Sequence, residues 1–464
     1  EDINKKTPIV GMEVELTIDK TIQYIAEKAL KKAIDSSRAK GGTAIVMDPH
    51  TGEVLAMASM PTFDPNELKD SRPGQRKNKA ITDSFEPGSI FKLFLVSAGI
   101  EENAVKTTDA IYCENGSYMV ADRVFHDTKK HGWLTVPQII KYSSNIGSAK
   151  IGERLGKARL YRYLKSFGFG DKTGIDLPGE AAGSFRNPSD WSEVTLHTVS
   201  FGHGVSTTGI QLITALSSIA NRGFLMKPYV VKALRDSKGG AVSEAHPVIV
   251  RRVISEATAK KMTDMLIGVT RDEGTGVKAA IDGFDAAGKT GTAQKPDLRN
   301  GGYLKDAYVA SFMGFIPARS PRLAILVTVD EPQGDNYGGT VAAPVFKEIA
   351  SQSLSYLGVF SAGQKAPAVR LPPIDSIGGY DRDYGDGGAP SPARARGDEE
   401  RTTEWDSRYP STPDFSGKTV RTVLSMARDR SINIEIVGSG KAVAQRPSSG
   451  RSIPANGQVV VWFQ

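Results

Sequence analysis

Ser89-Ile90-Phe91-Lys92 is the stretch that decides the fold of this 464-residue chain. It follows a Pro-Gly pair and opens an uninterrupted apolar run over residues 93–96. That pattern predicts a buried helix that begins at the serine. Ser89 then lies at a helix N-terminus, where free backbone N–H groups and the helix dipole favour negative charge. Lys92 lies three residues on, on the same face, so the tetrad has the parts of a serine nucleophile with an amine as its base.

A second Ser-x-x-Lys tetrad lies at Ser37–Lys40, directly before Gly41-Gly42. About two such tetrads are expected by chance in a chain of this length, so the pattern alone is weak. Ser37 is predicted at the end of a helix, where the dipole disfavours an oxyanion. We therefore interpret the second tetrad as a solvated helix end.

Composition narrows the classes of partner. The net charge of +7 suits an acidic polymer or an anionic membrane surface as well as nucleic acid. No basic run alternates with aromatic residues, so nucleic acid is not an expected partner. Cys113 is the single cysteine, and the six histidines form no metal-binding signature. We expect neither a metal nor a cofactor.

Periodicity predicts an α+β layout for the first 358 residues, with helices packed on an antiparallel sheet. A helical subdomain is expected over roughly residues 90–226, and three consecutive strands after residue 280 read as a meander. The expected strands cover residues 13–18, 43–48, 53–58, 288–293, 308–316 and 323–329, and the clearest expected helices cover 21–37, 139–155, 210–221 and 345–357.

Composition changes after this domain. Gly, Pro, Asp and Arg dominate residues 361–408, which predicts a segment that buries little. Order is expected to return with a helix over 420–429 and strands over 433–437 and 458–463. The expected organisation is therefore a domain over residues 1–358, a flexible linker over 359–409 and a small α+β domain over 410–464.

Two more motifs accompany the tetrad. Ser143-Ser144-Asn145 follows a helical stretch, and Lys289-Thr290-Gly291-Thr292 lies on the first strand of the meander. Each has a second copy in a poorer context: residues 431–433 in the small C-terminal domain, and residues 172–174 in a predicted turn. Only Ser89, Ser143 and Lys289 occur in order within one domain-sized stretch.

The three motifs match the set Ser-x-x-Lys, Ser-x-Asn and Lys-Thr-Gly of penicillin-binding proteins and serine β-lactamases. Flanking segments, among them residues 54–61, 86–89, 131–136 and 338–346, resemble a class B penicillin-binding protein over about residues 10–358. The last 55 residues resemble a PASTA module. The resemblance implies a penicillin-binding/serine β-lactamase-like transpeptidase domain, with its sheet flanked by helices, followed by a small α+β PASTA domain.

The resemblance assigns roles to the motif residues. Ser89 is expected to attack a carbonyl and form an acyl-enzyme, while neutral Lys92 accepts its proton. Burial and a second cation, Lys289, are expected to lower the pKa of Lys92. Ser143 is expected to relay a proton to the leaving amine, and Asn145 to hold Lys92 or the substrate amide.

The third motif is expected to bind substrate. Lys289, Thr290 and Thr292 would hold a substrate carboxylate, and the strand itself could pair with an extended peptide. The backbone N–H groups of Ser89 and Thr292 would form an oxyanion hole. Gly291 would let a substrate backbone approach closely. Two further residues are expected to line the cleft, His203 and Tyr337.

By resemblance, the substrate is a peptidoglycan stem peptide ending in D-Ala-D-Ala, and β-lactams mimic that end. A role in the division septum or the spore cortex is expected, with a SEDS-family glycosyltransferase and divisome proteins as partners. The expected location is extracytoplasmic, with an N-terminal transmembrane anchor outside this sequence. Alternatives on the same fold stay open: a D,D-carboxypeptidase, a β-lactamase or a β-lactam sensor.

Overall fold

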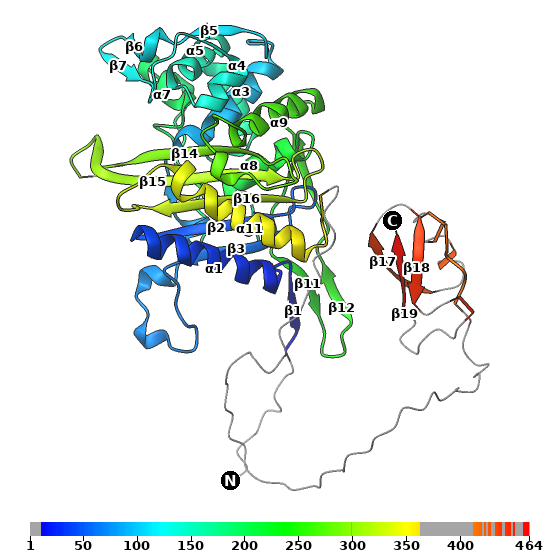
Figure 1. Ribbon diagram of the computed structural model, residues 1–464. Coiled ribbons are helices and arrows are strands. Elements are labelled where there is room, and N and C mark those ends of the chain that lie inside the picture. The colour runs from blue at the N-terminus through cyan, green and yellow to red at the C-terminus, as the bar shows by residue number, and fades with distance from the viewer. Residues whose placement is uncertain are drawn as a thin grey trace, which may run out of the picture. The chain divides into compact units, whose positions relative to one another are not determined.

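The structure is a computed structural model that describes residues 11–297, 299–361 and stretches of 412–463 (Figure 1). The chain divides into two compact units between Arg370 and Leu371, and each unit is described by itself. The predicted linker over 359–409 lies almost wholly outside the described residues. Among the described helices, none combines the length and the apolar character that crossing a membrane requires.

A five-stranded antiparallel sheet forms the centre of the larger unit, in the order β14-β15-β16-β2-β3. The predicted meander is confirmed, the strands predicted over 43–48 and 53–58 pair as a hairpin, and the two parts meet where β16 pairs with β2. Because β14 ends the order, one side of it has no neighbouring strand in the sheet. The five strands are β14 (Ala287–Pro296), β15 (Tyr303–Ile316), β16 (Leu323–Asp330), β2 (Gly41–Met47) and β3 (Val54–Met60).

Helices cover both faces of this sheet (Figure 1). Side chains alternate along β2, so Ala44 and Val46 pack in the cluster formed with α1 (Lys20–Ser37) and α11 (Ala343–Tyr356). Ile45 on the same strand faces the opposite cluster, which includes α8 (Gly209–Ala220). The fold is therefore a three-layer sandwich, in which Asp19 caps the start of α1.

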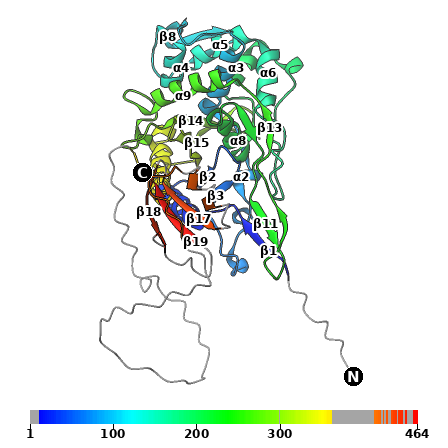
Figure 2. The same ribbon diagram turned by 90° about the vertical axis from the view of Figure 1, so that its right-hand side faces the viewer.

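A helical subdomain gathers at the end of the sheet beyond β14 in both views (Figure 1 and Figure 2). It also contains two small two-stranded sheets, β5 with β8 and β6 with β7, which were not predicted. Its elements are α3 (Lys92–Glu101), β5 (Ala110–Tyr112), β6 (Ser117–Val120), β7 (Arg123–His126), β8 (Trp133–Thr135), α4 (Val136–Tyr142), α5 (Asn145–Leu155), α6 (Lys157–Ser166) and α7 (Glu193–Ser200).

The single helix predicted over 139–155 is wrong, because the chain breaks between α4 and α5. Ser143 ends α4 in the left-handed region, at φ 61°, and Ser144 caps α5 by accepting from the N–H of Gly147 at 2.9 Å. Serine and asparagine satisfy helix ends better than helix interiors, because their short polar side chains bond nearby backbone groups. The break therefore lies at the Ser-x-Asn motif itself.

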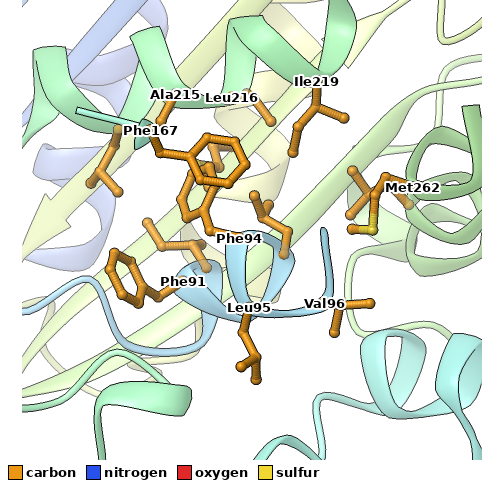
Figure 3. Packing of buried hydrophobic residues seen from close by; sticks show 14 of the residues in the cluster. Phe91, Phe94, Leu95, Val96, Phe167, Ala215, Leu216, Ile219 and Met262 are labelled. Carbon is orange, nitrogen blue, oxygen red and sulfur yellow. The ribbon is translucent and has the colours of Figure 1, made fainter. Parts of the chain in front are cut away.

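The predicted buried helix is α3, but it begins at Lys92 rather than at Ser89. Ser89 lies in a 3-10 turn, η3 (Gly88–Phe91), that leads into α3. Nine of the ten residues of α3 are buried, and Phe94 packs against Phe167 with ring centroids 4.9 Å apart (Figure 3). This packing fixes the base of the turn that presents Ser89.

The remaining elements of the larger unit lie around this frame. A three-stranded sheet, β1-β11-β12, extends from the end of the unit opposite the helical subdomain in both views (Figure 1 and Figure 2). All the remaining elements of the larger unit, including the three strands of this sheet, are β1 (Glu13–Leu16), η1 (Leu68–Asp70), η2 (Pro73–Gln75), α2 (Lys79–Thr82), β4 (Ser84–Phe85), η4 (Glu114–Gly116), η5 (Pro188–Asp190), β9 (Thr207–Thr208), β10 (Phe224–Met226), β11 (Val231–Arg235), β12 (Ala241–Glu244), β13 (Ile249–Arg252), α9 (Glu256–Thr270), η6 (Val277–Ala279) and α10 (Gly338–Val341).

The smaller unit contains a sheet in the order β17-β19-β18. The two predicted strands are confirmed as β17 (Asn433–Gly438) and β19 (Gln458–Phe463), which run parallel, and β18 (Ala442–Arg446) was not predicted. The helix predicted over 420–429 is helical at residues 422, 423, 426 and 427, and its other residues lie outside the described part. The small core of this unit contains three fully buried residues, Phe415, Val459 and Val461.

Candidate active site

The turn that carries Ser89 packs directly on β14. A side chain at Gly88, whose φ is 57°, would place Cβ only 3.0 Å from Cβ of Ala293. Cβ at Gly291 would lie 2.3 Å from Oγ of Ser311 and 3.2 Å from the carbonyl oxygen of Pro87. The two glycines therefore permit close contact between the nucleophile turn and the third motif. Gly291 was expected to make room for substrate, and its neighbours here are the protein's own atoms.

Lys92 is fully buried, and its ammonium group reaches across to the second motif. Its Nζ donates to the carbonyl oxygen of Ser143 at 2.6 Å, to Oγ of Ser143 at 3.1 Å and to Oδ1 of Asn145 at 2.7 Å. Burial disfavours the charged form and lowers the pKa of Lys92 to about 7, although the carboxylate of Asp127 opposes this shift. An amine with that pKa is available as a base near neutral pH.

Ser143 joins the two lysines. Its Oγ accepts from Nζ of Lys92 at 3.1 Å and from Nζ of Lys289 at 3.0 Å. With both amines donating to this oxygen, the Ser143 hydroxyl proton is left to point elsewhere. The left-handed backbone of Ser143 holds the side chain at this position between α4 and α5.

Lys289 is also fully buried, and its pKa lies well below the usual value. Burial is the larger cause and the charge of Lys92 is the second. The sequence predicted that Lys289 would lower the pKa of Lys92. Repulsion between two ammonium groups is mutual, so this charge effect belongs to the pair, and burial is the larger cause of the lowered pKa of both lysines.

Asp127 is a residue that the sequence did not reveal. Its carboxylate accepts from the N–H groups of Asn145 and Ile146 at 2.5 and 3.1 Å, and from Oγ of Ser144 at 2.5 Å. A carboxylate at the first turn of α5 satisfies free N–H groups and complements the helix dipole. Asp127 therefore fixes the start of α5, which carries Asn145. No local pattern marks it, because it lies 17 residues before Ser144.

The two threonines of the third motif are held in place by hydrogen bonds to residues outside the motif. Oγ1 of Thr290 donates to Oγ1 of Thr275 at 2.9 Å, and the N–H of Gly338 donates to Oγ1 of Thr292 at 3.1 Å. Gly338 lies so close to the sheet that a Cβ there would come within 2.2 Å of two backbone oxygens. Neither Thr275 nor Gly338 was predicted to support the site.

The two residues expected to line the cleft differ in their surroundings. Nδ1 of His203 lies 3.0 Å from the hydroxyl of Tyr303 and 3.1 Å from a carboxylate oxygen of Glu86. The neighbouring N–H of Gly204 donates to Glu86 at 2.9 Å, so this loop is tied to the segment just before Ser89. Tyr337 is exposed over 55% of its surface and precedes Gly338.

The hydroxyl of Ser89 has no hydrogen-bond partner among the described residues, and its side chain is half-buried. An unengaged hydroxyl on the turn that leads into α3, which begins at the buried Lys92, suits attack on an incoming carbonyl, since catalytic hydrogen bonds often form only with substrate bound. Within the described part of the chain, no group of three His, Cys, Asp or Glu residues is arranged to hold a metal ion.

Comparison with known proteins identifies both units. Residues 42–351 match the penicillin-binding protein transpeptidase domain, and residues 411–464 match the PASTA domain. A Neisseria flavescens protein named "Probable peptidoglycan D,D-transpeptidase PenA" is 36% identical over 353 residues, which cover 76% of this chain and 84% of that protein. Stage V sporulation protein D of Bacillus subtilis is 34% identical over 98% of this chain, which spans 66% of that relative.

Solved structures agree with this match. The apo transpeptidase domain of Burkholderia pseudomallei penicillin-binding protein 3 has a TM-score of 0.66 at 35% identity, and the match covers 74% of this chain and 96% of that one. Penicillin-binding protein 3 of Mycobacterium tuberculosis, complexed with aztreonam, has a TM-score of 0.71 at 34% identity, with coverages of 77% and 82%. The transpeptidase match spans two thirds of this chain and the relatives are peptidoglycan D,D-transpeptidases by name, so the chain belongs to the class B penicillin-binding proteins, the extracytoplasmic serine acyltransferases of peptidoglycan synthesis.

Proposed function

We propose that Ser89 takes an acyl group from a stem peptide ending in D-Ala-D-Ala and passes it to an amine of a neighbouring stem. In the first step Oγ of Ser89 bonds to the carbonyl carbon, the amide C–N bond breaks, and the terminal D-Ala leaves as an amine. In the second step the acceptor nitrogen bonds to the same carbon and the ester C–O bond breaks. The position of Ser143 Oγ between the buried amines of Lys92 and Lys289 is the observation that carries this proposal.

Lys92 and Ser143 carry every proton that moves in these two steps. Neutral Lys92 takes the proton from Ser89 during attack. Lys92 then donates to Oγ of Ser143, whose own hydroxyl proton passes to the leaving nitrogen. In the second step the path reverses, so the acceptor amine loses a proton through Ser143 and Lys92, and Ser89 regains its own. Asn145 holds the ammonium form of Lys92 through its Oδ1.

We also assign substrate binding to the free edge of β14. An extended peptide can add to this edge through backbone hydrogen bonds. Lys289 and the hydroxyls of Thr290 and Thr292 would hold its terminal carboxylate. The N–H groups of Ser89 and Thr292 would stabilise the oxyanion, consistent with the tight packing of the nucleophile turn on β14.

At the level of the whole protein, we propose an N-terminal transmembrane anchor, with a SEDS-family glycosyltransferase and divisome proteins as partners. The role proposed is wall synthesis at the division septum or the spore cortex, and a sporulation protein is similar over 98% of this chain. The proposed domains are residues 1–358 and 410–464, joined by a linker over 359–409. The two family matches, at 42–351 and 411–464, support this division.

The fate of the acyl group decides between transpeptidase and hydrolase. The protein is incubated with a peptide ending in D-Ala-D-Ala, with and without a second peptide that carries a free amine, and products are measured by mass spectrometry. We expect D-Ala release and a cross-linked product that exceeds the hydrolysed one when the amine is present. A fluorescent penicillin should give an adduct that persists for minutes. Release within seconds, or hydrolysis alone, would indicate a β-lactamase or a carboxypeptidase.

Replacing Asp127 with alanine should slow acylation by penicillin about a hundredfold, since misplacing a group that orients catalytic residues has effects of that size. The variant frees the start of α5 and hence Asn145. Asp127→Asn keeps one acceptor oxygen and should lose less. Because it removes the carboxylate charge that raises the pKa of Lys92, it should also move the pH dependence of acylation to lower pH. Stopped-flow acylation across pH checks both effects, and wild-type rates in Asp127→Ala would exclude this role.

A further inference from the structure

An exposed aromatic pair lies on the small sheet formed by β5 and β8. Trp133 is 69% exposed, the largest exposed fraction among the large apolar side chains of the described residues. Its register partner on the other strand is Tyr112, and the two ring centroids lie 5.4 Å apart at an interplanar angle of 46°. Two large rings held together in contact with solvent are typical of a binding surface rather than of a core.

Polar groups surround this pair. The hydroxyl of Tyr112 accepts from Nδ2 of Asn115 at 2.8 Å, which leaves Oδ1 of Asn115 without a partner among the described residues. This Oδ1 and the ring of Tyr112 lie 3.7 and 3.8 Å from the position of a Cβ built on Gly132, the residue before Trp133. Lys130 packs against the backbone of the residue that follows Asn115. In the described part of the chain, neither Nε1 of Trp133 nor the ammonium group of Lys130 has a partner.

The two strands beneath the pair are fixed by the core of the subdomain. Side chains alternate along each strand, and Ile111 and Leu134, the pair next to Tyr112 and Trp133, are buried. The ammonium group of Lys150 also donates to the carbonyl oxygen of Tyr112 at 2.8 Å. The exposed rings are therefore held in place before a ligand arrives, so binding costs little side-chain entropy.

This surface adjoins the second motif. Cys113 follows Tyr112 in the chain, and its Sγ accepts from Oγ of Ser144, the middle residue of the Ser-x-Asn motif, at 3.5 Å. The stem peptides of the proposed substrate are attached to a glycan strand, and an extended peptide rises about 3.3 Å per residue. A stem bound in the cleft therefore keeps its sugar within a few residue lengths of the second motif.

The size and chemistry of the surface favour a sugar polymer over a protein partner. A stable protein interface buries about 800 Å² per partner around an apolar core. On β5 and β8 the exposed apolar part consists of two rings, with an amide and an ammonium group beside them. A sugar ring presents C–H groups on its face and hydroxyl groups around its edge, so it can stack on an aromatic ring and form hydrogen bonds at the same time.

We infer that the surface formed by Trp133, Tyr112, Asn115 and Lys130, the aromatic platform, binds the glycan strand of peptidoglycan, a β-1,4-linked polymer of N-acetylated amino sugars. The choice of ligand rests on the proposed function, because the glycan carries the stem peptides. The ring of Trp133 stacks on the face of one sugar. Oδ1 of Asn115 accepts from a hydroxyl or amide group, and Lys130 donates to an oxygen. The platform holds the polymer beside the cleft and does not touch the reacting atoms.

Binding of a peptide-free saccharide tests the platform directly. Calorimetric titration of the full chain uses a hexamer of β-1,4-linked N-acetylglucosamine and, for comparison, a hexamer of α-1,4-linked glucose, which has no acetamido groups. The amino-sugar hexamer should bind more tightly, and Trp133→Ala should weaken its binding about tenfold, a factor of the size expected for one aromatic stack. Tyr24→Ala is the matched control, because Tyr24 on α1 is 61% exposed and has the ammonium group of Lys28 5.9 Å from its ring centroid. It should bind as the wild type does.

Turnover connects the platform to the proposed reaction. Two donors ending in D-Ala-D-Ala are compared, one a free peptide and the other the same peptide attached to a short glycan strand. In the wild type the glycan-linked donor should have a lower KM for D-Ala release, and Trp133→Ala should remove this advantage. The kcat value and the rate of acylation by penicillin should not change, whereas a general loss of structure would lower both.

The outcomes separate glycan binding from the proposed function. A wild type that fails to bind the amino-sugar hexamer, that binds the glucose hexamer equally well, or whose binding survives in Trp133→Ala overturns the inference, while D-Ala release still supports the proposed acyl-enzyme. A dimer that sedimentation detects in the wild type and not in Trp133→Ala would mean that a second copy covers the platform, which also overturns it. A wild-type protein that neither donor nor penicillin acylates would overturn the proposed function, and the calorimetry would still decide whether the platform binds glycan.

Discussion

Replacing Ser89 with alanine should abolish covalent labelling by a fluorescent penicillin. The acyl bond forms on Oγ of Ser89, and alanine offers no atom that could take its place. The side chain is half-buried and its hydroxyl bonds no described residue, so its loss should cost little stability. We therefore expect complete loss of the labelled band on a gel, with a thermal unfolding midpoint close to that of the wild type.

The chain supplies a matched control for this experiment in its second Ser-x-x-Lys tetrad. Ser37 lies at the last residue of α1 and its Oγ donates to the carbonyl oxygen of Ala33 at 2.6 Å. Ser37→Ala makes the same chemical change away from the cleft and should label at the wild-type rate. Persistent labelling of Ser89→Ala would place the nucleophile at another residue.

Acylation should be slow at low pH, rise through about pH 7 and then level off, because Lys92 accepts a proton only when neutral. Burial lowers the pKa of Lys92 from 10.5 to about 7, so its ammonium form predominates below that value and its amine form above it. Lys92→Gln keeps a polar side chain but has no basic nitrogen. We expect this variant to acylate about 10²- to 10⁴-fold more slowly, with no step near pH 7.

Second-order rate constants for penicillin acylation between pH 5 and 9 measure this profile. Lys40→Gln is the control, because Lys40 is the lysine of the second tetrad and pairs with Glu331 away from the cleft. It should retain the wild-type profile. A wild-type rate that falls as pH rises through 7 would mean that the ammonium form is the active one, and would exclude Lys92 as the base.

Local signals in the sequence were sufficient to predict most of the main helices and strands of the larger unit. The apolar run after Ser89 predicted a buried helix, because a helix that is apolar on every side must lie inside. The strands expected over residues 43–48 and 53–58 and the meander expected after residue 280 correspond to β2, β3 and β14 to β16. The helix over 139–155 failed since its apolar spacing continued through the Ser-Ser-Asn break, where capping bonds outweigh helix propensity.

The residues that hold the motif side chains in place could not be predicted from local sequence patterns. Asp127 reaches Ser144 from 17 residues away, and Gly338 reaches Thr292 from 46 residues away. Such contacts depend on how the subdomain and the sheet meet, which periodicity does not encode. The motif residues were found because their spacing is characteristic, whereas a lone Asp or Gly has no pattern to distinguish it. The burial of Lys92 and Lys289 likewise became visible only in three dimensions.

The unpaired side of β14 carries a risk of self-association. A strand that keeps hydrogen-bonding groups free for a peptide also offers them to the strand of another copy, which is how edge strands start aggregation. The chain limits this risk at the end of the strand, where Pro296 lacks an N–H group, while the ammonium group of Lys295 beside it is already paired with Asp330 and Glu331. The helical subdomain stands beyond β14 on this same side of the sheet (Figure 1). Colloidal stability and access for substrate are therefore set by the same ten residues.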